Sequence, residues 1–406
     1  MGVEQPLFLH EDVLPAIPSG WHWSRSDSLV IQLKPGKLFD TKTVAATGAV
    51  PVLNQSESGA LGYHDEEPGV VASPSAPVVT FANHTCAMRL VRHPFSAIQN
   101  IFPKVGRQAV CDTVWFYYAL LGRVRTNEYK GHHPLFRDAF VPVPPIATQR
   151  RIASILSAFD DLIEINTQRI AILEEMARRI YEEWFVRFRF PGHENVRMVE
   201  SELGLVPEGW RVRALGDFID DVRDSVNPDA VSPETPYVGL EHIPRRSIAL
   251  AEWGHAAEVG SSKLRFREGD ILFGKIRPYF HKVAVAPVAG VASSDAIVMR
   301  AKQAQDFGLA LAVASSDAFV AHATQTSNGT KMPRANWGVL RQYPVPTPPP
   351  ALHKRFEEFM AGVVSAVANH VLRNRNLRVT RDLLLPKLVS GELDVSALPE
   401  PEALAA

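Results

Sequence analysis

The chain has 406 residues, of which 46% are hydrophobic and 21% are charged. This length predicts two or three domains, and this composition excludes a disordered chain. No apolar run reaches the roughly 18 residues of a membrane span, and we expect no secretory signal. The cysteines, Cys86 and Cys111, have neither CxxC nor zinc-binding spacing, so no metal site is expected and the predicted location is the reducing cytoplasm.

The formal net charge is −1 and the pI is about 6.9. A protein that coats DNA without selectivity is usually basic, so this charge balance argues against one. It does not exclude a protein that carries positive charge only where it contacts DNA.

Residues 1–145 are of mixed character and predict a first globular domain. They contain the turn sequence PSGW at residues 18–21 and short apolar runs such as residues 76–81. Pro144 and Pro145 then prevent a helix from extending backwards, and a helical spacer is expected over residues 146–192. Its apolar residues alternate spacings of four and three, which is typical of a helix–helix seam. The seam residues are Ile152, Leu156, Phe159, Ile163, Asn166, Ile170 and Leu173.

The second half of the chain follows the same order. Residues 207–210 (PEGW) lie near the start of a second mixed domain, predicted over residues 193–348, with short strands near residues 270–273 and 282–286. A second helical spacer is expected over residues 349–395, with Pro386 ending or kinking its helix, and residues 396–406 form a tail. Its seam residues are Phe356, Met360, Val363, Val367, Asn374 and Leu377, with His370 and Arg381 as polar interruptions.

An internal duplication relates the two halves. Residues 142–152 (PVPPIATQRRI) match residues 346–356 (PTPPPALHKRF) at an offset of 204, which continues without a gap through the helices. The two mixed domains show little resemblance to each other. Two equivalent frames that carry different domains favour a protein with two different recognition parts.

The expected fold class is therefore α+β, with two globular domains separated by two long helices that pack as an antiparallel coiled coil with a pseudo-twofold repeat. Asn166 and Asn374 would then meet as a buried pair that fixes register, or they would face solvent at an imperfect seam. A helix of about 33 residues spans roughly 50 Å. That length matches about 15 base pairs of DNA, as expected for a split site with an unread gap.

Several segments resemble the specificity subunits of Type I restriction-modification systems, and together they cover nearly the whole chain. In the second half these are residues 269–279 (GDILFGKIRPY), 329–334 (GTKMPR) and 382–393 (DLLLPKLVSGEL). In the first half, residues 78–85 (VVTFANHT) and 99–103 (QNIFP) resemble another recognition-domain subtype. The proline-rich segment at residues 142–152, just before the first helix, has the family's glutamine, Gln149. The second copy has His353 at the equivalent position.

The resemblance implies two target recognition domains that each read half of a bipartite site on double-stranded DNA. It implies two helical regions that dock two modification (methyltransferase) subunits, which restriction (translocase and nuclease) subunits then join. The complex, a site-specific deoxyribonuclease and adenine methyltransferase in defence against foreign DNA, would use S-adenosylmethionine, ATP and Mg²⁺. The resemblance also implies that this subunit binds none of these cofactors, is not catalytic by itself and contacts no membrane.

Motif searches find no competing chemistry. The sequence has no P-loop, no Asn-Pro-Pro-Tyr or Asp-Pro-Pro-Tyr methyltransferase motif, no HExxH and no GxSxG. Neighbouring side chains such as His132 and His133, or Asp160 and Asp161, point apart, so solvated positions or a phosphate contact are favoured over a metal or catalytic site.

Candidate DNA contacts are polar and basic residues on loops, because such groups reach base edges and phosphates. Each of them could instead be an ordinary surface residue. One cluster of the second domain follows an apolar strand and has alternating basic residues, a pattern with little structural purpose, so it is the strongest candidate. That cluster is Lys275, Arg277, Tyr279 and Lys282; the second cluster there is Ser327, Asn328, Thr330, Lys331 and Arg334; the first domain offers Asn83, His84, Lys104, Arg107, Lys130 and His132.

Two other functions stay open at this point. An enzyme that combined this frame with cutting or methylation would turn over DNA when supplied with Mg²⁺ and S-adenosylmethionine. A non-DNA scaffold with two binding domains on a coiled coil would show no sequence-dependent DNA binding, even with partner subunits present.

Overall fold

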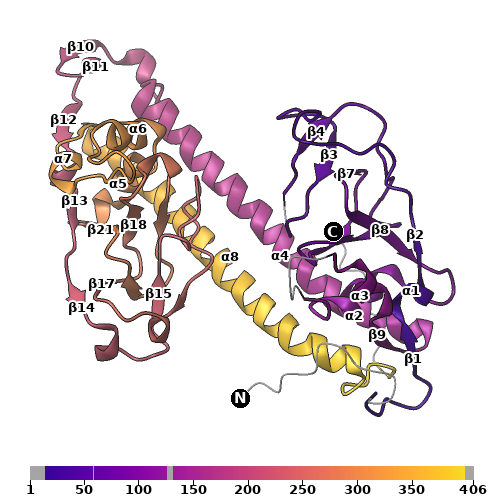
Figure 1. The fold of residues 1–406 in the computed structure, drawn as a ribbon. Helices are drawn as coiled ribbons and strands as arrows, with labels where there is room; N and C mark the ends of the chain where they lie inside the picture. The colour runs from indigo at the N-terminus through magenta and orange to yellow at the C-terminus, as the bar shows by residue number, and fades with distance from the viewer. Residues whose placement is uncertain (1–13, 58, 126–130, 398–406) are drawn as a thin grey trace. The chain divides into compact units, whose positions relative to one another are not determined.

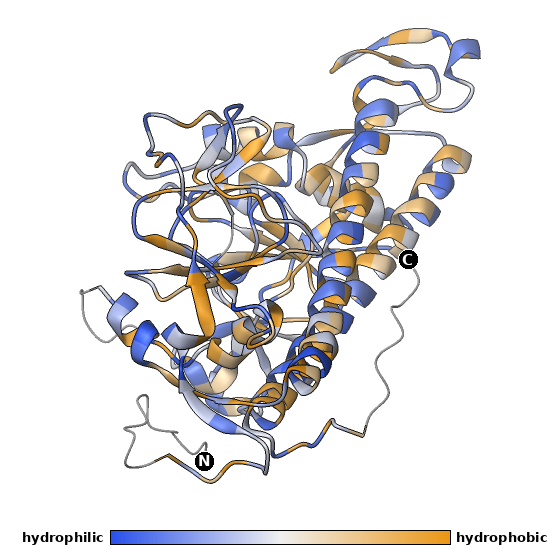
Figure 2. Ribbon diagram, turned by 90° about the vertical axis from the view of Figure 1, so that its right-hand side faces the viewer, coloured by the Kyte–Doolittle hydropathy of each residue, from blue (hydrophilic) through white to orange (hydrophobic). Residues whose placement is uncertain are grey.

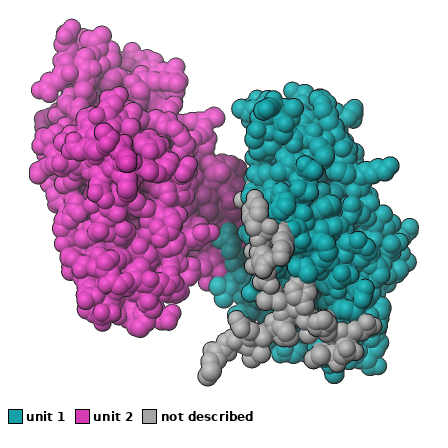
Figure 3. Space-filling view, in the orientation of Figure 1, with its two compact units in different colours: residues 1–161, 378–406 teal, residues 162–377 magenta. Residues whose placement is uncertain are grey.

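The computed structural model describes residues 14–57, 59–125 and 131–397. The chain divides into two compact units, which Figure 3 shows in different colours. Unit 1 consists of residues 1–161 and 378–406, and unit 2 consists of residues 162–377. Each long helix thus contributes residues to both units, whereas the sequence had assigned the helices to spacers of their own.

Unit 1 is built from short apolar strands and three short helices (Figure 1). Strand β5 is buried at all five residues and is central in a four-stranded antiparallel sheet of order β2-β8-β5-β6. A three-stranded sheet has the order β4-β3-β7, and β1 pairs with β9. The strands are β1 (His22–Arg25), β2 (Val30–Gln32), β3 (Val50–Leu53), β4 (Gly62–His64), β5 (Val78–Ala82), β6 (Met88–Val91), β7 (Ser96–Ala97), β8 (Ile101–Gly106) and β9 (Phe140–Val143); the helices are α1 (Ser26–Leu29), α2 (Thr113–Leu120) and α3 (His133–Asp138).

Unit 2 contains a four-stranded sheet of order β13-β21-β18-β19, a five-stranded sheet of order β14-β17-β20-β15-β16, and the pairs β10-β11 and β12-β22. The strands are β10 (Met198–Ser201), β11 (Gly204–Pro207), β12 (Arg211–Ala214), β13 (Ile219–Asp221), β14 (Ser225–Val226), β15 (Pro236–Val238), β16 (Gly254–His255), β17 (Lys263–Phe266), β18 (Ile271–Gly274), β19 (Val283–Val285), β20 (Gly290–Ala292), β21 (Ala296–Ala301) and β22 (Pro344–Thr347).

The helices of unit 2 cover the four-stranded sheet, and α5 is buried along nearly all of its apolar sequence. The α-helices are α5 (Phe307–Ala314), α6 (Asp317–Gln325) and α7 (Trp337–Leu340), and the short 3₁₀ turns are His193–Asn195, Leu215–Asp217, Pro228–Ala230, Ala256–Glu258, Pro278–Phe280 and Ala304–Asp306.

The two long helices are α4 (Ile146–Tyr181), which continues into a π-helical turn at Glu182–Val186, and α8 (Pro350–Ser390). Apolar and polar residues alternate along both, as Figure 2 shows. The helical part of the first spacer therefore ends six residues before residue 192, where the sequence had placed its end. Pro386 does not end α8, because it lies near the C-terminus, where a missing N–H removes at most one helical hydrogen bond.

The internal duplication is visible in the structure. In each half a P-x-G-W turn precedes a strand that pairs with the strand before a long helix: β1 with β9 and β12 with β22. The tryptophan N–H donates to the proline carbonyl oxygen at 3.1 Å in both turns. Gly20 and Gly209 adopt φ of 82° and 88°, a region that favours glycine.

Within unit 2 the long helices run antiparallel. The amide of Asn166 donates to the Asn374 Oδ1 atom at 2.9 Å, and further along α4 the Phe185 ring lies 4.5 Å from the Phe356 ring. Asn166 and Asn374 are 6% and 4% exposed, so the buried pair is confirmed and the solvent-facing alternative is wrong. The other predicted seam residues are buried or half-buried, and the seam also includes Val371, which the sequence pattern did not select.

Candidate nucleic-acid interface

Two segments that the sequence singled out separately meet in unit 2. Ile276, just after β18, forms an antiparallel bridge with Arg334. The Arg277 N–H donates to the Pro333 carbonyl oxygen at 2.7 Å, and the Ala335 N–H donates to the Lys275 carbonyl oxygen at 2.8 Å. The two predicted second-domain clusters therefore form one continuous surface.

A third loop, which the sequence did not single out, completes this surface. Residues 293–295 join β20 to β21, and the Lys275 N–H donates to the Asp295 carbonyl oxygen at 3.0 Å. The Asp295 carboxylate lies 3.9 Å from the Lys275 Nζ atom and 3.9 Å from an Arg334 guanidinium nitrogen. We call residues 275–277, 293–295 and 328–334 the loop cluster. Sequence alone gave no signal for residues 293–295, because only the sheet order brings them beside β18.

The side chains of the predicted second-domain residues divide into supports and exposed groups. Lys275 donates to the Ser294 carbonyl oxygen at 2.5 Å, and burial lowers its pKa. Lys282 donates to the Leu240 carbonyl oxygen, and Ser327 donates to the Thr324 carbonyl oxygen at 2.7 Å. These three residues hold loops together. The groups that reach solvent are Tyr279, Asn328, Thr330, Lys331 and Arg334.

The backbone of Arg277 is strained. Its φ is 49°, in the left-handed region that a non-glycine residue adopts at a cost of about 1–2 kcal/mol. The hydrogen bond to Pro333 holds it there, and its half-buried side chain lies near the Phe280 ring, 6.0 Å from the ring centre. Such strain persists where surrounding structure imposes it, which is a feature of ligand-binding loops.

In unit 1 the polar candidates gather around the turn after β5. The Asn83 side-chain oxygen accepts from the His133 N–H at 2.9 Å, and the His84 N–H donates to the Gln55 side chain at 3.0 Å. The His84 ring lies 3.2 Å from the Asn100 side-chain nitrogen. Sequence reasoning missed Gln55 and Asn100; the left-handed φ of 68° at Asn100 is not readable from residue type alone.

Two of the DNA contacts predicted for the first domain are wrong, because the side chains are buried. Lys104 is 1% exposed and His132 is 2% exposed, so neither side chain reaches the surface. Lys104 lies in β8, where both faces of the strand are covered, and His132 is held by the Asn83 carbonyl oxygen at 3.1 Å. Arg107 is exposed and donates to the Ser28 carbonyl oxygen at 2.9 Å. Lys130 lies outside the described residues.

Lys104 is a buried cation with weak compensation. Its Nζ atom lies 3.2 Å from the Gln32 side-chain oxygen and 5.4 Å from the centre of the Phe136 ring. Burial lowers the pKa of Lys104 to about 8 and, in the same core, the pKa of His133 to about 4. His133 stacks on Phe102 with ring centres 3.8 Å apart.

We therefore expect Lys104→Met to raise the stability of unit 1 at pH 7 by about 1–2 kcal/mol, because a buried charge is replaced by an apolar chain of similar volume. The folded-state pKa lies below the ordinary value, so the wild-type penalty is complete below about pH 8 and fades as pH rises towards 10.5. Urea denaturation of both proteins at pH 7 and pH 10 measures this. A difference that did not shrink at pH 10, or a lost DNA specificity in the variant, would contradict the assignment of Lys104 to the core.

Three carboxylates on the first long helix are partly exposed and also bind neighbouring elements, which the sequence did not predict. Asp160 accepts from the Tyr118 hydroxyl at 2.5 Å and pairs with Arg381, and Asp161 pairs with Arg92 in the same unit. In unit 2, Glu174 accepts from the Ser247 hydroxyl at 2.7 Å and from two backbone N–H groups beside it. These carboxylates fasten globular elements to the helices.

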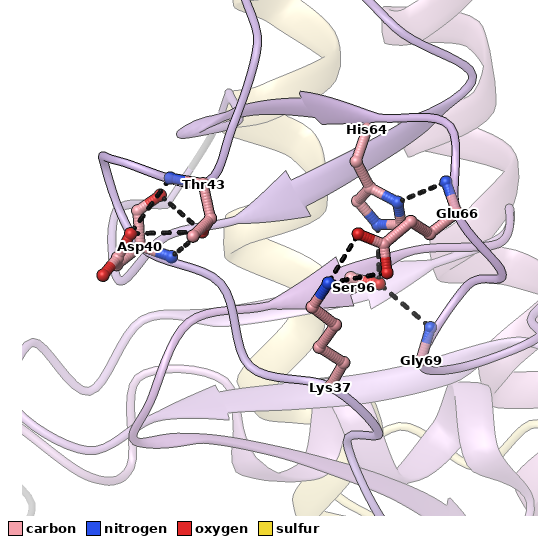
Figure 4. Close-up of polar contacts among 7 residues, drawn as sticks. All are labelled: Lys37, Asp40, Thr43, His64, Glu66, Gly69 and Ser96. Carbon is pink, nitrogen blue, oxygen red and sulfur yellow. Dashed lines mark hydrogen bonds and ion pairs between the residues drawn. The ribbon is translucent and has the colours of Figure 1, made fainter.

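One serine–histidine pair in unit 1 has the wrong proton arrangement for a nucleophile (Figure 4). The His64 Nε2 atom lies 2.9 Å from the Ser96 hydroxyl, and the Glu66 N–H donates to His64 Nδ1 at 3.0 Å. In the neutral ring Nδ1 is therefore the acceptor and Nε2 carries the proton, so His64 cannot take a proton from Ser96. The Gly69 N–H also donates to the Ser96 oxygen at 2.9 Å, which makes this a buried structural network.

The described ranges contain neither a candidate metal site nor a single helix that could span a membrane. No group of three or more His, Cys, Asp or Glu side chains in those ranges could hold a metal ion. No single helix there is long and apolar enough to cross a membrane; residues 304–314 and 317–325, a pair bent by 67°, pass only by length and composition.

Comparisons with known proteins give the class of the chain first. A family model described as "Type I restriction modification DNA specificity domain" matches residues 136–175, the end of the first globular part and most of α4. The Type I restriction enzyme EcoDI specificity subunit of Escherichia coli is 24% identical, with 95% of each chain covered. The MjaIX specificity subunit of Methanocaldococcus jannaschii is 25% identical, covering 76% of this chain and 75% of the relative.

A solved structure supports the fold. The Type I restriction-modification S subunit from M. genitalium superposes with a TM-score of 0.62 at 15% identity, covering 92% of this chain and 96% of the other. In sequence the chain is similar, over most of its length, to specificity subunits of Type I restriction-modification systems.

Proposed function

We infer that this subunit recognises a bipartite site on double-stranded DNA and directs methylation and restriction by partner subunits to that site. The observation that carries this function is the loop cluster of unit 2. There, separate polar and basic segments converge at strand ends, with a strained arginine and an exposed rim of Tyr279, Lys331 and Arg334. Such loops present donors and acceptors to base edges and phosphates.

In unit 1 the polar turn around Asn83, His84, Gln55 and Asn100 would take the equivalent role for the other half-site.

The test is a methylation map of DNA from a host that carries this gene with its neighbouring modification gene, compared with the same host lacking this gene. A split motif that disappears with the gene would establish the function and identify both half-sites. Unchanged methylation, with both proteins expressed, would sink the proposal and favour a non-DNA scaffold.

The docking of modification subunits is supported by an apolar stripe on α4 within unit 2. Leu162, Ile165, Ile172 and Met176 are 40%, 43%, 60% and 46% exposed, although they lie on a long helix whose other face is buried. With Arg169 they keep the three–four spacing of a second heptad seam, which fits another helix. We assign this stripe to a helix of a modification subunit, with two such subunits per complex and restriction subunits joining them.

We expect the double variant Ile165→Asp with Ile172→Asp to lose copurification with the modification subunit, because two carboxylates would be buried in an apolar helix contact. Pull-down of the tagged subunit from cells that express both proteins measures this. Ala171→Asp is the matched control, since Ala171 is exposed on α4 away from the stripe. Wild-type copurification by the double variant would remove the stripe as a docking site.

S-adenosylmethionine, ATP and Mg²⁺ are proposed to act in the partner subunits. Equilibrium dialysis of the isolated subunit with S-adenosylmethionine should therefore show no saturable binding, and the complex should show it. Saturable binding by the isolated subunit would contradict this assignment.

A further inference from the structure

The loop cluster contains a carboxylate at a place where DNA phosphates would repel it. Asp295 lies between two cations, and its side chain is 36% exposed. Among the described residues no hydrogen bond reaches either carboxylate oxygen, and the cations stand at 3.9 Å on both sides. If Asp295 served only to anchor Lys275, the Lys275 ammonium would donate a hydrogen bond to its carboxylate. The ammonium instead donates to the Ser294 carbonyl oxygen.

Neighbouring acids are committed to structure. Asp270 accepts two hydrogen bonds from the Arg300 guanidinium, at 2.8 and 2.6 Å, and is 3% exposed. Asp221 pairs with Arg223 at 2.6 Å, and its side chain is 5% exposed. Asp295 differs from both because its acceptor atoms are available while its backbone is fixed by the hydrogen bond from Lys275.

The chemistry of base edges limits what Asp295 can contact. A carboxylate only accepts hydrogen bonds, and in the major groove the donors are the exocyclic amino groups of cytosine and adenine. Lys275 and Arg334 offset its charge against the phosphates, and Arg334 is exposed beside it. Guanine and thymine present acceptor oxygens at the corresponding edge, which a carboxylate would repel.

We propose that Asp295 determines specificity by accepting a hydrogen bond from the exocyclic amino group of one cytosine or adenine in the half-site read by unit 2. This inference rests on the proposed function. Arg334 and Lys275 position and neutralise the carboxylate, and the strained turn at Arg277 fixes the loop beside it.

The test repeats the methylation map with Asp295→Asn, Asp295→Ala and the control Asp229→Asn, an exposed acid on another turn of unit 2. One fixed base pair of one half-site supplies the amino group, from cytosine in a G·C pair or from adenine in an A·T pair, and comparison of the variant maps with the wild-type map identifies it. Asp295→Ala should reduce the preference for that base pair by about tenfold or more, while the other half-site stays unchanged. The control should give the wild-type map.

Three results separate the possibilities. An unchanged motif in both Asp295 variants overturns the proposal. A uniform loss of methylation at all positions, with wild-type thermal melting of the nearly isosteric Asp295→Asn variant, also overturns it, because it assigns Asp295 to positioning the cations. Absence of any split motif with the wild-type subunit is the failure of the proposed function, and it is seen before any variant is compared.

Discussion

The variant Glu357→Ala is expected to lower the free energy of unfolding of unit 2 by about 2–4 kcal/mol, because it leaves two buried N–H groups without acceptors. Glu357 is 9% exposed on α8, and its carboxylate accepts from the Gly308 N–H at 2.6 Å and the Leu309 N–H at 2.7 Å. These are first-turn donors of α5, whose own preceding aspartate, Asp306, makes no side-chain capping bond. The negative charge of the Glu357 carboxylate is also stabilised by the positive end of the α5 dipole.

In unit 1 the first-turn N–H groups of a helix are capped by the residue directly before that helix. There Asp112 caps α2 itself and accepts from the Val114 and Trp115 N–H groups at 2.9 Å each. A cap supplied by another helix fastens α5 to α8, so its loss should loosen that contact as well as the end of the helix. The burial that raises the pKa of Asp306 is part of the same arrangement.

Urea denaturation of Glu357→Ala and Glu357→Gln, with hydrogen exchange at Gly308 and Leu309, measures the effect. The glutamine variant keeps one acceptor oxygen and should lose about half as much stability. The matched control is Glu358→Ala, an exposed neighbour on α8 that should change stability by less than about 0.5 kcal/mol. Unaltered protection of both amides in Glu357→Ala would show that the cap contributes little.

This arrangement also shows what the sequence repeat could not reveal. Gln149 and His353 occupy equivalent positions, yet Gln149 accepts from the Asp112 N–H and donates to the Val110 and Pro144 carbonyl oxygens. His353 instead lies 3.3 Å from Glu357 and 3.8 Å from Asp306. The offset of 204 predicts which residues are equivalent, whereas their contacts depend on the different globular elements packed against each helix.

Helix periodicity was the most informative signal because a single stripe of side chains determines which face is buried. It predicted that the two long helices pack on each other as an antiparallel pair, and the buried Asn166–Asn374 pair was one of the two alternatives that it left open. The polar residues after β18 were found for a local reason, because an apolar strand that ends in polar residues places them at a strand end. Their contact with residues 328–334 is long-range and was not predicted. Whether those residues contact DNA stays a prediction.

Strand pairing could not be predicted in the same way. Parallel pairs such as β3 with β7 join segments that are distant in sequence, and no periodicity encodes their order. Lys104 is an example. From sequence it is a basic residue beside a proline, and only the position of β8 inside the sheet shows that its side chain is buried. Residues 293–295 were missed for the same reason.

The second large effect is expected at the buried amide pair. Asn374→Ala should destabilise unit 2 by about 1–3 kcal/mol, because it removes the partner of the Asn166 amide in a site closed to water. The Asn374 amide also donates to the Ile163 carbonyl oxygen and the Thr167 hydroxyl, both at 3.2 Å. These three hydrogen bonds join α4 to α8 in the observed register.

Replacing both residues by leucine should have the opposite effect on stability. A buried polar pair can be exchanged for packed apolar side chains at no cost or with a gain, but the helices then lose the contact that distinguishes one register from the next. We expect Asn166→Leu with Asn374→Leu to unfold at the same or a higher urea concentration than the wild type and to support less methylation when combined with the modification subunit.

A double-mutant cycle of the two single leucine variants and the pair, scored by both stability and methylation, tests this. The single variants should each be destabilised, since each buries one unpaired amide, and the coupling between them should be favourable. Full methylation by the stable leucine pair would show that side-chain packing along the rest of the seam already fixes the register. The asparagines would then be tolerated polar residues whose removal only strengthens the helix contact.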